Sequence, residues 1–200
     1  MKRIKDSNDK YHSHKSISAS GLKTIYKKSV YHHLNSMFKM TDAMNFGSAV
    51  HSALLEDSND IAVLPEFNAR TKEGKKIKQD FFDNNKGKII IKQEEQEAIE
   101  KIKKNFNGHS LAKSLVQRLT ETEVSYYGTI DKVPVRVRPD GIKDNDYIID
   151  IKTTMDASPR YFKSQVYNFA YHLQACFYSE ALGYDPAKFR FITIENKYPY

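Results

Sequence analysis

An apolar segment with one charge inside it constrains the fold more than any other feature of this sequence. Residues 147–151 read Tyr-Ile-Ile-Asp-Ile, a short run typical of a strand that is buried on both faces. The side chain of Asp150 would then lie in apolar surroundings, and burying an unpaired carboxylate costs several kcal/mol unless a cation compensates it. The fold must therefore bring a cation to Asp150.

A second acidic residue precedes that strand. Asp140 stands in the segment Arg-Pro-Asp-Gly, ten residues before Asp150, and the residues 143–146 between them are typical of a polar turn. Side chains alternate across a strand, so Asp150 and Lys152 share one face, while the isoleucines on either side of Asp150 face the core. A hairpin through residues 143–146 brings Asp140 alongside. The sequence therefore predicts two carboxylates and a lysine at one place.

These three groups have a shared chemistry. Carboxylates that converge without thiolates suit Mg²⁺ or Mn²⁺, and a nearby lysine could hold or deprotonate a water or neutralise a phosphate in the transition state. Phosphodiester hydrolysis uses all of these parts. The alternative is that Asp140 and Asp150 are ordinary turn and strand-end residues with Lys152 as a solvated partner. The apolar strand around Asp150 favours the site.

Composition narrows the partners and the compartment. Thirty-two Lys and Arg against 25 Asp and Glu leave a formal net charge of +7 at pH 7, which favours polyanions as partners. The sequence has no apolar run long enough for a membrane helix and no signal-peptide pattern at its start, so we expect no membrane partner. The single cysteine, Cys176, excludes an internal disulfide and is typical of a reducing compartment, so we expect a cytoplasmic protein.

Hydrophobic periodicity predicts the order of the elements. Residues 1–15 are expected to form a flexible basic arm, and residues 16–200 a single domain. The 3.6-residue period predicts helices over residues 18–34, 43–56, 93–106, 110–119 and 158–182, whereas the period of two predicts a hairpin over residues 123–138 and strands at 147–151 and 189–194. Residues 57–88 are expected to form a long basic loop or lid.

Several short motifs are weak alone but specific in their order and spacing. They are Ser18-Ala19-Ser20-Gly21-Leu22, Gly47-Ser48-Ala49-Val50-His51 followed by Leu54-Leu55-Glu56, Arg70-Thr71 with Gly74-Lys75, Glu123-Val124-Ser125, Arg138-Pro139-Asp140, Asp150-Ile151-Lys152-Thr153-Thr154, and Tyr171-His172-Leu173-Gln174 with Phe177-Tyr178. On these motifs the chain resembles the PD-(D/E)xK nuclease superfamily, most closely the RecE-type exodeoxyribonuclease VIII catalytic domain of phage recombination systems.

The resemblance implies an α/β fold with a restriction-endonuclease-like core, in which helices flank a central mixed β-sheet. The metal ligands that it implies are His51, Asp140, Asp150 and the backbone carbonyl of Ile151. Lys152 would orient the attacking water. Together with Asp140 and Asp150, it would carry the catalysis.

Two further residues extend that implied site. Glu123 matches an acidic position of the lambda-type exonucleases and would help a second metal or the nucleophile. His51 taken alone is more often a packed or surface histidine than a ligand, but Gly47 one turn earlier and the downstream carboxylates favour ligation. An imidazole suits Mn²⁺ better than Mg²⁺, so this ligand set predicts tolerance of manganese.

The DNA contacts are expected from three parts of the chain. Tyr167, Tyr171, Gln174 and Tyr178 recur on one helical face, opposite a core stripe of Phe162, Val166, Phe169, Leu173 and Phe177. Gln174 and Tyr178 match the Q-x-x-x-Y element of RecB-type nucleases, which contacts DNA or the lysine; semi-buried packing is the alternative. Arg70 and Lys75, among the lysines of the expected loop, would grip phosphates unless they are merely solvated, and Arg138 is assigned to the same DNA-binding set.

The combined prediction is a Mg²⁺- or Mn²⁺-dependent exonuclease that resects double-stranded DNA ends, 5′ to 3′, and leaves a 3′ single strand for an annealing recombinase in a bacterial or phage-infected cell. Relatives form rings, which implies a homo-oligomer, and they continue past the segment at residues 195–200, so we expect a chain truncated at its C-terminus. A non-catalytic or partner-dependent DNA-binding module is one alternative. A RecB-like nuclease acting on single strands is another, although the lack of a cysteine cluster disfavours its iron–sulfur form.

Overall fold

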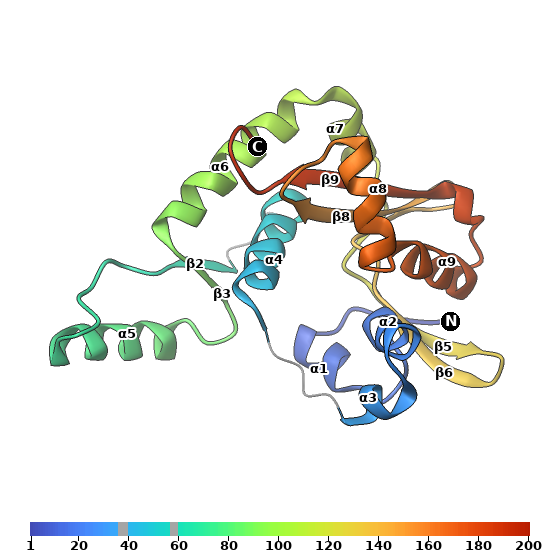
Figure 1. Ribbon diagram of the computed structural model, residues 1–200, viewed down its shortest axis with the longest axis horizontal. Helices are drawn as coiled ribbons and strands as arrows, with labels where there is room; N and C mark the ends of the chain where they lie inside the picture. Colours follow the sequence, from blue (N-terminus) through green and yellow to red (C-terminus); the bar gives the residue numbers. More distant parts are fainter. Residues whose placement is uncertain (36–39, 57–59) are drawn as a thin grey trace. The chain divides into compact units, whose positions relative to one another are not determined.

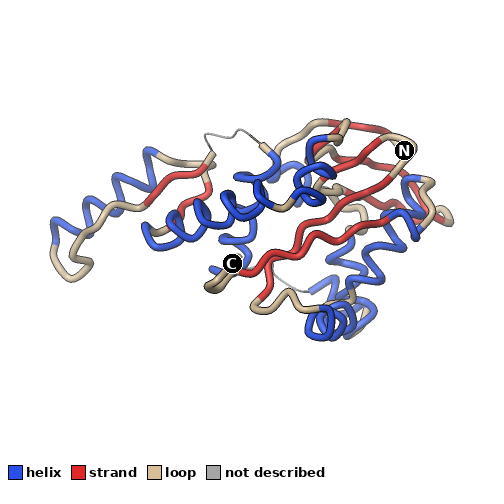
Figure 2. The backbone as a smooth tube through the Cα atoms, turned by 90° about the horizontal axis from the view of Figure 1, so that it is seen from above, coloured by secondary structure: helices blue, strands red, loops and turns tan. Residues whose placement is uncertain are grey.

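The structure is a computed structural model that describes residues 1–35, 40–56 and 60–200. Helices and strands both recur along the described chain (Figures 1 and 2), which confirms the predicted α/β class. The backbone divides into two compact units: Met1–Phe38 with Ser114–Ile194, and Lys39–Lys113 with Glu195–Tyr200. Within the described ranges, none of the helices has the length and apolar character needed to cross a membrane.

The first unit contains two sheets, ordered β1-β5-β6 and β4-β7-β8-β9. The pairs β1–β5, β5–β6, β4–β7 and β7–β8 are antiparallel. The strands are β1 (Lys2–Ile4), β4 (Glu121–Thr122), β5 (Ser125–Ile130), β6 (Val133–Val137), β7 (Gly141–Lys143), β8 (Tyr147–Thr154) and β9 (Phe189–Glu195). The helices are α1 (Asn8–Ser13), α2 (Ala19–Lys27), α3 (Val30–Asn35), the second half of α7 (Ser110–Gln117), α8 (Pro159–Asn168), α9 (Tyr171–Leu182) and the short 3-10 helix η1 (Pro186–Lys188).

Both predicted hairpins of this unit are confirmed. The β5–β6 turn is Asp131-Lys132, and both residues have positive φ, 48° and 67°, as a tight two-residue turn requires. The β7–β8 turn uses Asn145 at φ 59°. A core forms where helix α9 meets these strands, and its buried members are Ala19, Val135, Val137, Ile142, Ile148, Phe177, Tyr178 and Phe189.

The N-terminal residues are packed, which corrects the expectation of a flexible arm at residues 1–15. Strand β1 pairs with β5, and helix α1 buries Tyr11. Asp6 forms an ion pair of 2.6 Å with Arg138, whose side chain is 7% exposed. The lysines that suggest a solvated arm lie on the outside, while the few inward residues between them carry the packing. Because these inward residues follow no regular spacing, the net charge of the segment does not reveal that it packs.

The predicted long helix over residues 158–182 is also wrong in one respect, because it is two helices. Ala170 has a left-handed backbone with φ 51°, which ends α8 and starts α9 in a new direction. Ala170 is fully buried while Phe169 is 52% exposed, so the break changes which side chains face the core. The predicted tyrosine face and core stripe therefore do not continue through this point. The helix expected over residues 18–34 is likewise divided, into α2 and α3.

The second unit is built around helices α4 (Asp42–Leu55) and α6 (Gln93–Gly108), both of which the sequence predicts. The segment expected to be a loop at 57–88 instead contains strand β2 (Ile61–Val63) and helix α5 (Lys72–Asn84), and β2 pairs in parallel with β3 (Ile89–Ile91); residues 57–59 lie outside the described residues. The hydroxyl of Thr71 accepts a hydrogen bond from the Gly74 N–H and caps α5. Thr71 is a sequence signal for the start of a helix, although the many lysines of the segment suggest a loop.

Candidate functional site

The carboxylates predicted around strand β8 do meet there. Asp150 lies mid-strand and is 1% exposed, and the side chains of Ile149 and Ile151 are fully buried. The antiparallel β7–β8 pairing sets Gly141 opposite Ile149, so Asp140, just before β7, arrives beside Asp150. The Ile151 N–H donates a 2.5 Å hydrogen bond to Asp140 Oδ2. The geometric prediction from strand alternation is confirmed.

Lys152 supplies the cation that Asp150 requires. Its ammonium forms a close ion pair with Asp150 Oδ2. Burial alone would lower the pKa of Lys152, but the charges of Asp150 and Asp140 outweigh it and raise the pKa above the ordinary value of 10.5. Lys152 is therefore an ammonium at neutral pH. In this state it carries a positive charge and donates hydrogen bonds, and it cannot accept a proton.

A side-chain relay holds the other oxygen of Asp150. The amide nitrogen of Gln174, on α9, donates to Asp150 Oδ1 at 2.6 Å. Lys23, on α2, donates to the amide oxygen of Gln174 at 2.6 Å. Burial, aided by the nearby Lys152 ammonium, lowers the pKa of Lys23 to about 8. Because Lys23 takes up the amide oxygen, the Gln174 side chain can present only its NH₂ group to Asp150.

Two tyrosines of α9 complete the surroundings. The Tyr178 hydroxyl donates to the carbonyl of Arg138 at 3.2 Å, and burial raises the pKa of Tyr178 well above 10.0, so the hydroxyl keeps its proton. The ring of Tyr171 has the ammonium of Lys23 at 5.0 Å and that of Lys152 at 5.1 Å from its centre. Gln174 and Tyr178 are 7% and 6% exposed, so they stabilise the interior of the site. This burial contradicts the DNA contacts predicted for them.

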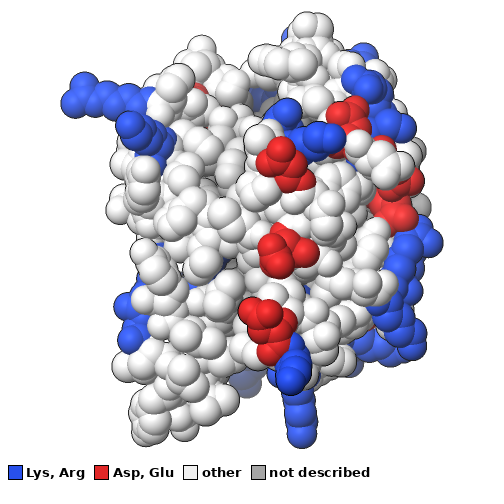
Figure 3. All heavy atoms as spheres, turned by 90° about the vertical axis from the view of Figure 1, so that its right-hand side faces the viewer, with Lys and Arg blue, Asp and Glu red and all other residues white. Residues whose placement is uncertain are grey.

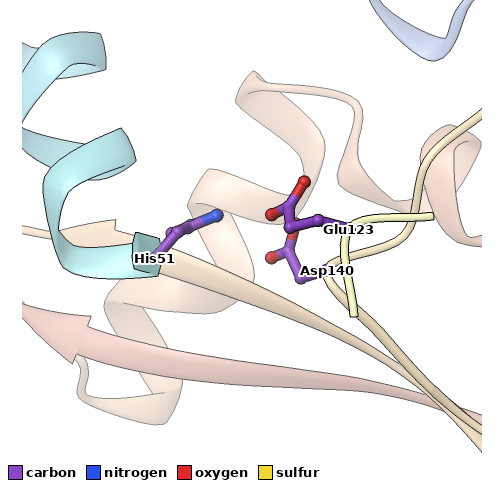
Figure 4. A group of neighbouring side chains, drawn as sticks. All are labelled: His51, Glu123 and Asp140. Atoms are coloured by element: carbon purple, nitrogen blue, oxygen red, sulfur yellow. The ribbon is translucent and has the colours of Figure 1, made fainter. Parts of the chain in front are cut away.

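Glu123 reaches the same region from the link between β4 and β5. Its backbone has positive φ, 52°, and its N–H donates to the Asp140 carbonyl at 3.2 Å. A carboxylate oxygen of Glu123 lies within 4.8 Å of one from Asp140. Figure 4 shows these carboxylates side by side. A left-handed residue that is not glycine is a local strain, and here it turns an acidic side chain toward a second one.

The donor set fits a divalent cation. Two carboxylates within 4.8 Å repel each other unless a positive charge lies between or beside them. Asp150 Oδ2 is buried and, apart from the Lys152 ion pair, has no hydrogen-bond partner among the described residues. Converging carboxylate oxygens are the donors that Mg²⁺ and Mn²⁺ prefer.

His51 and Ile151 are the other ligands that the resemblance implies. His51 lies on α4 of the second unit, partly buried, and it is also labelled in Figure 4. Ile151 lies in β8, where its N–H is committed to Asp140. The roles of the His51 ring and of the Ile151 carbonyl as ligands stay predictions.

The residues predicted to contact phosphates differ in exposure. Arg138 is buried against Asp6, and its Nε donates to Ser125 Oγ at 2.7 Å. These contacts contradict its predicted role as a DNA-binding residue. Arg70 and Lys75 are exposed in the second unit, before and on α5. On the face drawn in Figure 3, acidic side chains gather along the middle and basic ones lie mostly to either side, so the positive charge is not one continuous surface there.

Two residues of the site and its surroundings, Lys23 and Asp6, have no sequence signal that predicts their contacts. Lys23 directly follows the motif at residues 18–22, and its partner Gln174 is 151 positions away. Asp6 pairs with Arg138 over a separation of 132 residues. Neither has a local spacing that marks it, because each is brought to its partner by tertiary packing alone.

Comparisons with known proteins agree with this geometry. The family model described as "PDDEXK-like domain of unknown function (DUF3799)" matches residues 18–198, and the chain belongs to this family. A solved structure of a candidate exonuclease from Eubacterium rectale is similar, with a TM-score of 0.61 and 16% identity, over 98% of this chain and 75% of that one. At that identity the likeness concerns the fold. No curated protein matches the chain.

The fold and the site together define a nuclease-type domain. The family is PDDEXK-like, and a restriction-endonuclease-like core is confirmed. The residues that give this motif its letters are present as Asp140, Asp150 and Lys152. Lys152 pairs with Asp150, and Asp140 accepts a hydrogen bond from the Ile151 N–H between them. The acidic group formed by Glu123 and Asp140 adds a place where a metal ion could bind.

Proposed function

We propose that the chain is a Mg²⁺- or Mn²⁺-dependent exodeoxyribonuclease of the RecE type, which hydrolyses phosphodiester bonds at the ends of double-stranded DNA. The observation that carries the proposal is the buried contact of Asp150 with Lys152, beside Asp140, in a PDDEXK-like domain. A buried carboxylate that is paired with an ammonium and adjoined by a second carboxylate is costly to maintain for stability alone. Phosphodiester hydrolysis gives that arrangement a use.

In this proposal Asp140, Asp150 and the Ile151 carbonyl hold the ion, and His51 supplies a nitrogen ligand. Glu123 serves a second ion or the attacking water. A bound divalent ion would polarise the scissile phosphate and lower the pKa of a coordinated water. The Asp140 and Glu123 carboxylates, within 4.8 Å of each other, support a shared cation.

The protein's own groups have separate tasks. Lys152 donates from its ammonium to the attacking water or to a phosphate oxygen, and so offsets the charge that develops during attack. Gln174 keeps Asp150 in one orientation through its 2.6 Å hydrogen bond. Arg70 and Lys75, exposed in the second unit, contact the DNA backbone, which fixes position without reading sequence.

The biological setting is part of the proposal. The motifs shared with RecE-type enzymes support resection in the 5′ to 3′ direction, in phage-type homologous recombination, with a single-strand annealing recombinase as partner. They also support a ring-shaped homo-oligomer, and the single cysteine is consistent with a cytoplasmic location. The net charge of +7 is consistent with a polyanionic substrate.

The test uses linear duplex DNA that bears 5′ phosphates and is labelled at either the 5′ or the 3′ end of one strand. With Mn²⁺ or Mg²⁺ we expect the 5′ label to appear as mononucleotide, while the 3′ label stays on shortening strands. EDTA should stop the reaction. Asp150→Asn should abolish cleavage, and Asp144→Asn, an exposed aspartate in the turn of the same hairpin, is the matched control that should retain it.

Further variants separate the ligand roles. His51→Ala and Glu123→Gln should raise the Mn²⁺ concentration needed for half-maximal rate. Full activity of Asp150→Asn would refute the site. Release of the 3′ label first would refute the direction but keep the enzyme class, and DNA binding without any metal-dependent product would favour a non-catalytic module.

A further inference from the structure

Exposed aromatic side chains gather on one part of the first unit. Tyr26 on α2 is 64% exposed, Tyr167 on α8 is 65% exposed, and Phe169 between α8 and α9 is 52% exposed. Single exposed apolar residues are ordinary, but several in contact mark a surface that binds something. The break between α8 and α9 at Ala170 is what directs Phe169 outward.

The rings contact one another in two groups. His172 contacts Tyr26 edge-on at 6.3 Å between ring centres and Tyr167 at 5.6 Å. Phe169 stacks on Tyr171 at 5.6 Å with only 28° between the ring planes. We call these five residues the aromatic strip; they come from helices α2, α8 and α9 and the link between the last two.

Lysines accompany the strip along its length. The ammonium of Lys27 lies 5.7 Å from the centre of the Phe169 ring, and it also bonds to the carbonyl of Asn168. At the inner end, Tyr171 faces both Lys23 and Lys152. Tyr171 therefore lies beside the lysine of the candidate site, and Lys27, which lies beside Phe169, directly follows the exposed Tyr26 in the sequence.

Two of the three helices that carry the strip bear positive charge only, whereas the third, α9, contains Glu180. Helix α2 carries lysines and helix α8 carries Arg160 and Lys163, and neither helix contains an aspartate or a glutamate. An apolar docking surface for a neutral protein segment does not need such a bias. Aromatic faces interleaved with cations match a chain of phosphates and bases, because every base has a π-face that can stack and every phosphate carries a negative charge.

We propose that the aromatic strip binds single-stranded DNA, with unpaired bases stacked on Tyr26, Tyr167 and Phe169 and the backbone near Lys27. The choice of DNA as the nucleic acid rests on the proposed function. The strip then guides one unpaired strand between the surface and Lys152. Duplex DNA does not satisfy this surface, because its bases already stack on each other.

The test measures binding of a short fluorescein-labelled oligothymidine by anisotropy, in EDTA, so that cleavage plays no part. Tyr26→Ala and Tyr167→Ala should each weaken binding by about 5- to 150-fold, the range expected for one lost stacking contact. Tyr26→Phe and Tyr167→Phe keep the ring and should bind as the wild type does. Tyr198→Ala, which removes a tyrosine that is 84% exposed in the other unit, is the matched control and should leave binding unchanged.

Salt dependence adds a second readout. Lys27→Met should reduce the slope of log affinity against log salt concentration by about 0.7, the value for one phosphate contact on a single strand. Because Tyr26 and Tyr167 are mostly exposed, circular dichroism should show the alanine variants folded. An unchanged slope in Lys27→Met would remove the phosphate contact from the proposal.

The outcomes separate this inference from the proposed function. Binding that depends on the strip, in a protein that degrades no DNA, supports the strip and refutes the exonuclease. An active exonuclease whose alanine variants bind oligothymidine within about twofold of the wild type refutes the strip alone. A change of oligomeric state in those variants, with unchanged binding, would show that the strip joins copies of the chain and would also overturn the proposal.

Discussion

The ion pair between Asp6 and Arg138 gives the sharpest prediction about stability. The two side chains are 10% and 7% exposed, and their atoms approach to 2.6 Å. Asp6 also accepts hydrogen bonds from Ser125 Oγ at 2.6 Å and from the Tyr127 hydroxyl. Asp6→Ala removes the carboxylate and leaves the Arg138 guanidinium buried without its counter-charge. Breaking one side of a buried pair costs about 3–5 kcal/mol.

The assay is urea unfolding, with thermal melting beside it. A loss of that size corresponds to a melting temperature lower by about 6–20 °C for a chain of this length. Asp9→Asn is the matched control, because Asp9 is an exposed acid in the first turn of α1, and it should cost less than about 1 kcal/mol. In the background of Arg138→Met, Asp6→Ala should cost far less, which isolates the pair.

The same pair sets an acid limit to stability. Burial alone would raise the pKa of Asp6, but the hydrogen bonds from Ser125, Tyr127 and Arg138 lower it below 3.8. The folded state therefore binds this proton less tightly than the unfolded state. The stabilisation is complete above about pH 5 and is lost as the pH falls through the folded-state pKa. A cost of less than about 1 kcal/mol for Asp6→Ala, or no difference in acid unfolding between it and the wild type, would show that the ion pair does not stabilise the fold.

Two more substitutions test particular contacts. Lys23→Met releases the Gln174 amide, and loss of a residue that orients a ligand through another side chain typically lowers activity about 10- to 100-fold. We expect kcat to fall by that factor in Lys23→Met, to recover in part in Lys23→Arg, and to stay unchanged in the exposed control Lys28→Met. A kcat within about twofold of the wild type in Lys23→Met would contradict the relay. Gly74→Ala should destabilise the second unit by about 1–3 kcal/mol in urea unfolding, because a Cβ there would lie 2.0 Å from the Asn68 carbonyl oxygen. Gly108→Ala, in α6 with open space around it, should be neutral or slightly stabilising, and equal effects of the two would count against the steric argument.

Local sequence patterns predict much of the secondary structure and the placement of the residues around Asp150. Strand alternation around Asp150 places Lys152 on its face and the isoleucines in the core, because a side-chain period of two leaves no other choice. The hairpin through residues 143–146 then positions Asp140. Helices α4 and α6 follow from their apolar stripes, since each buries one face.

Features that depend on tertiary packing are not predictable in this way. The break at Ala170 has no glycine or proline to mark it, and it is stabilised by contacts such as that of Lys27 with the Asn168 carbonyl. The packing of the N-terminal residues depends on Asp6 meeting Arg138, and the orientation of Gln174 depends on Lys23. In each case the partner is distant in sequence, so no periodicity records the contact.

The role of Lys152 in nuclease activity is tested by the time course of nucleotide release from linear duplex DNA, with Mn²⁺ or EDTA, for the wild type and Lys152→Ala. Lys152 is the one cation in contact with the buried Asp150 among the described residues, and its substitution leaves the proposed metal ligands in place. We expect release that requires Mn²⁺ and is lost in Lys152→Ala while the variant stays folded. Metal-dependent release at the wild-type rate in Lys152→Ala would show that Lys152 is not needed for the reaction.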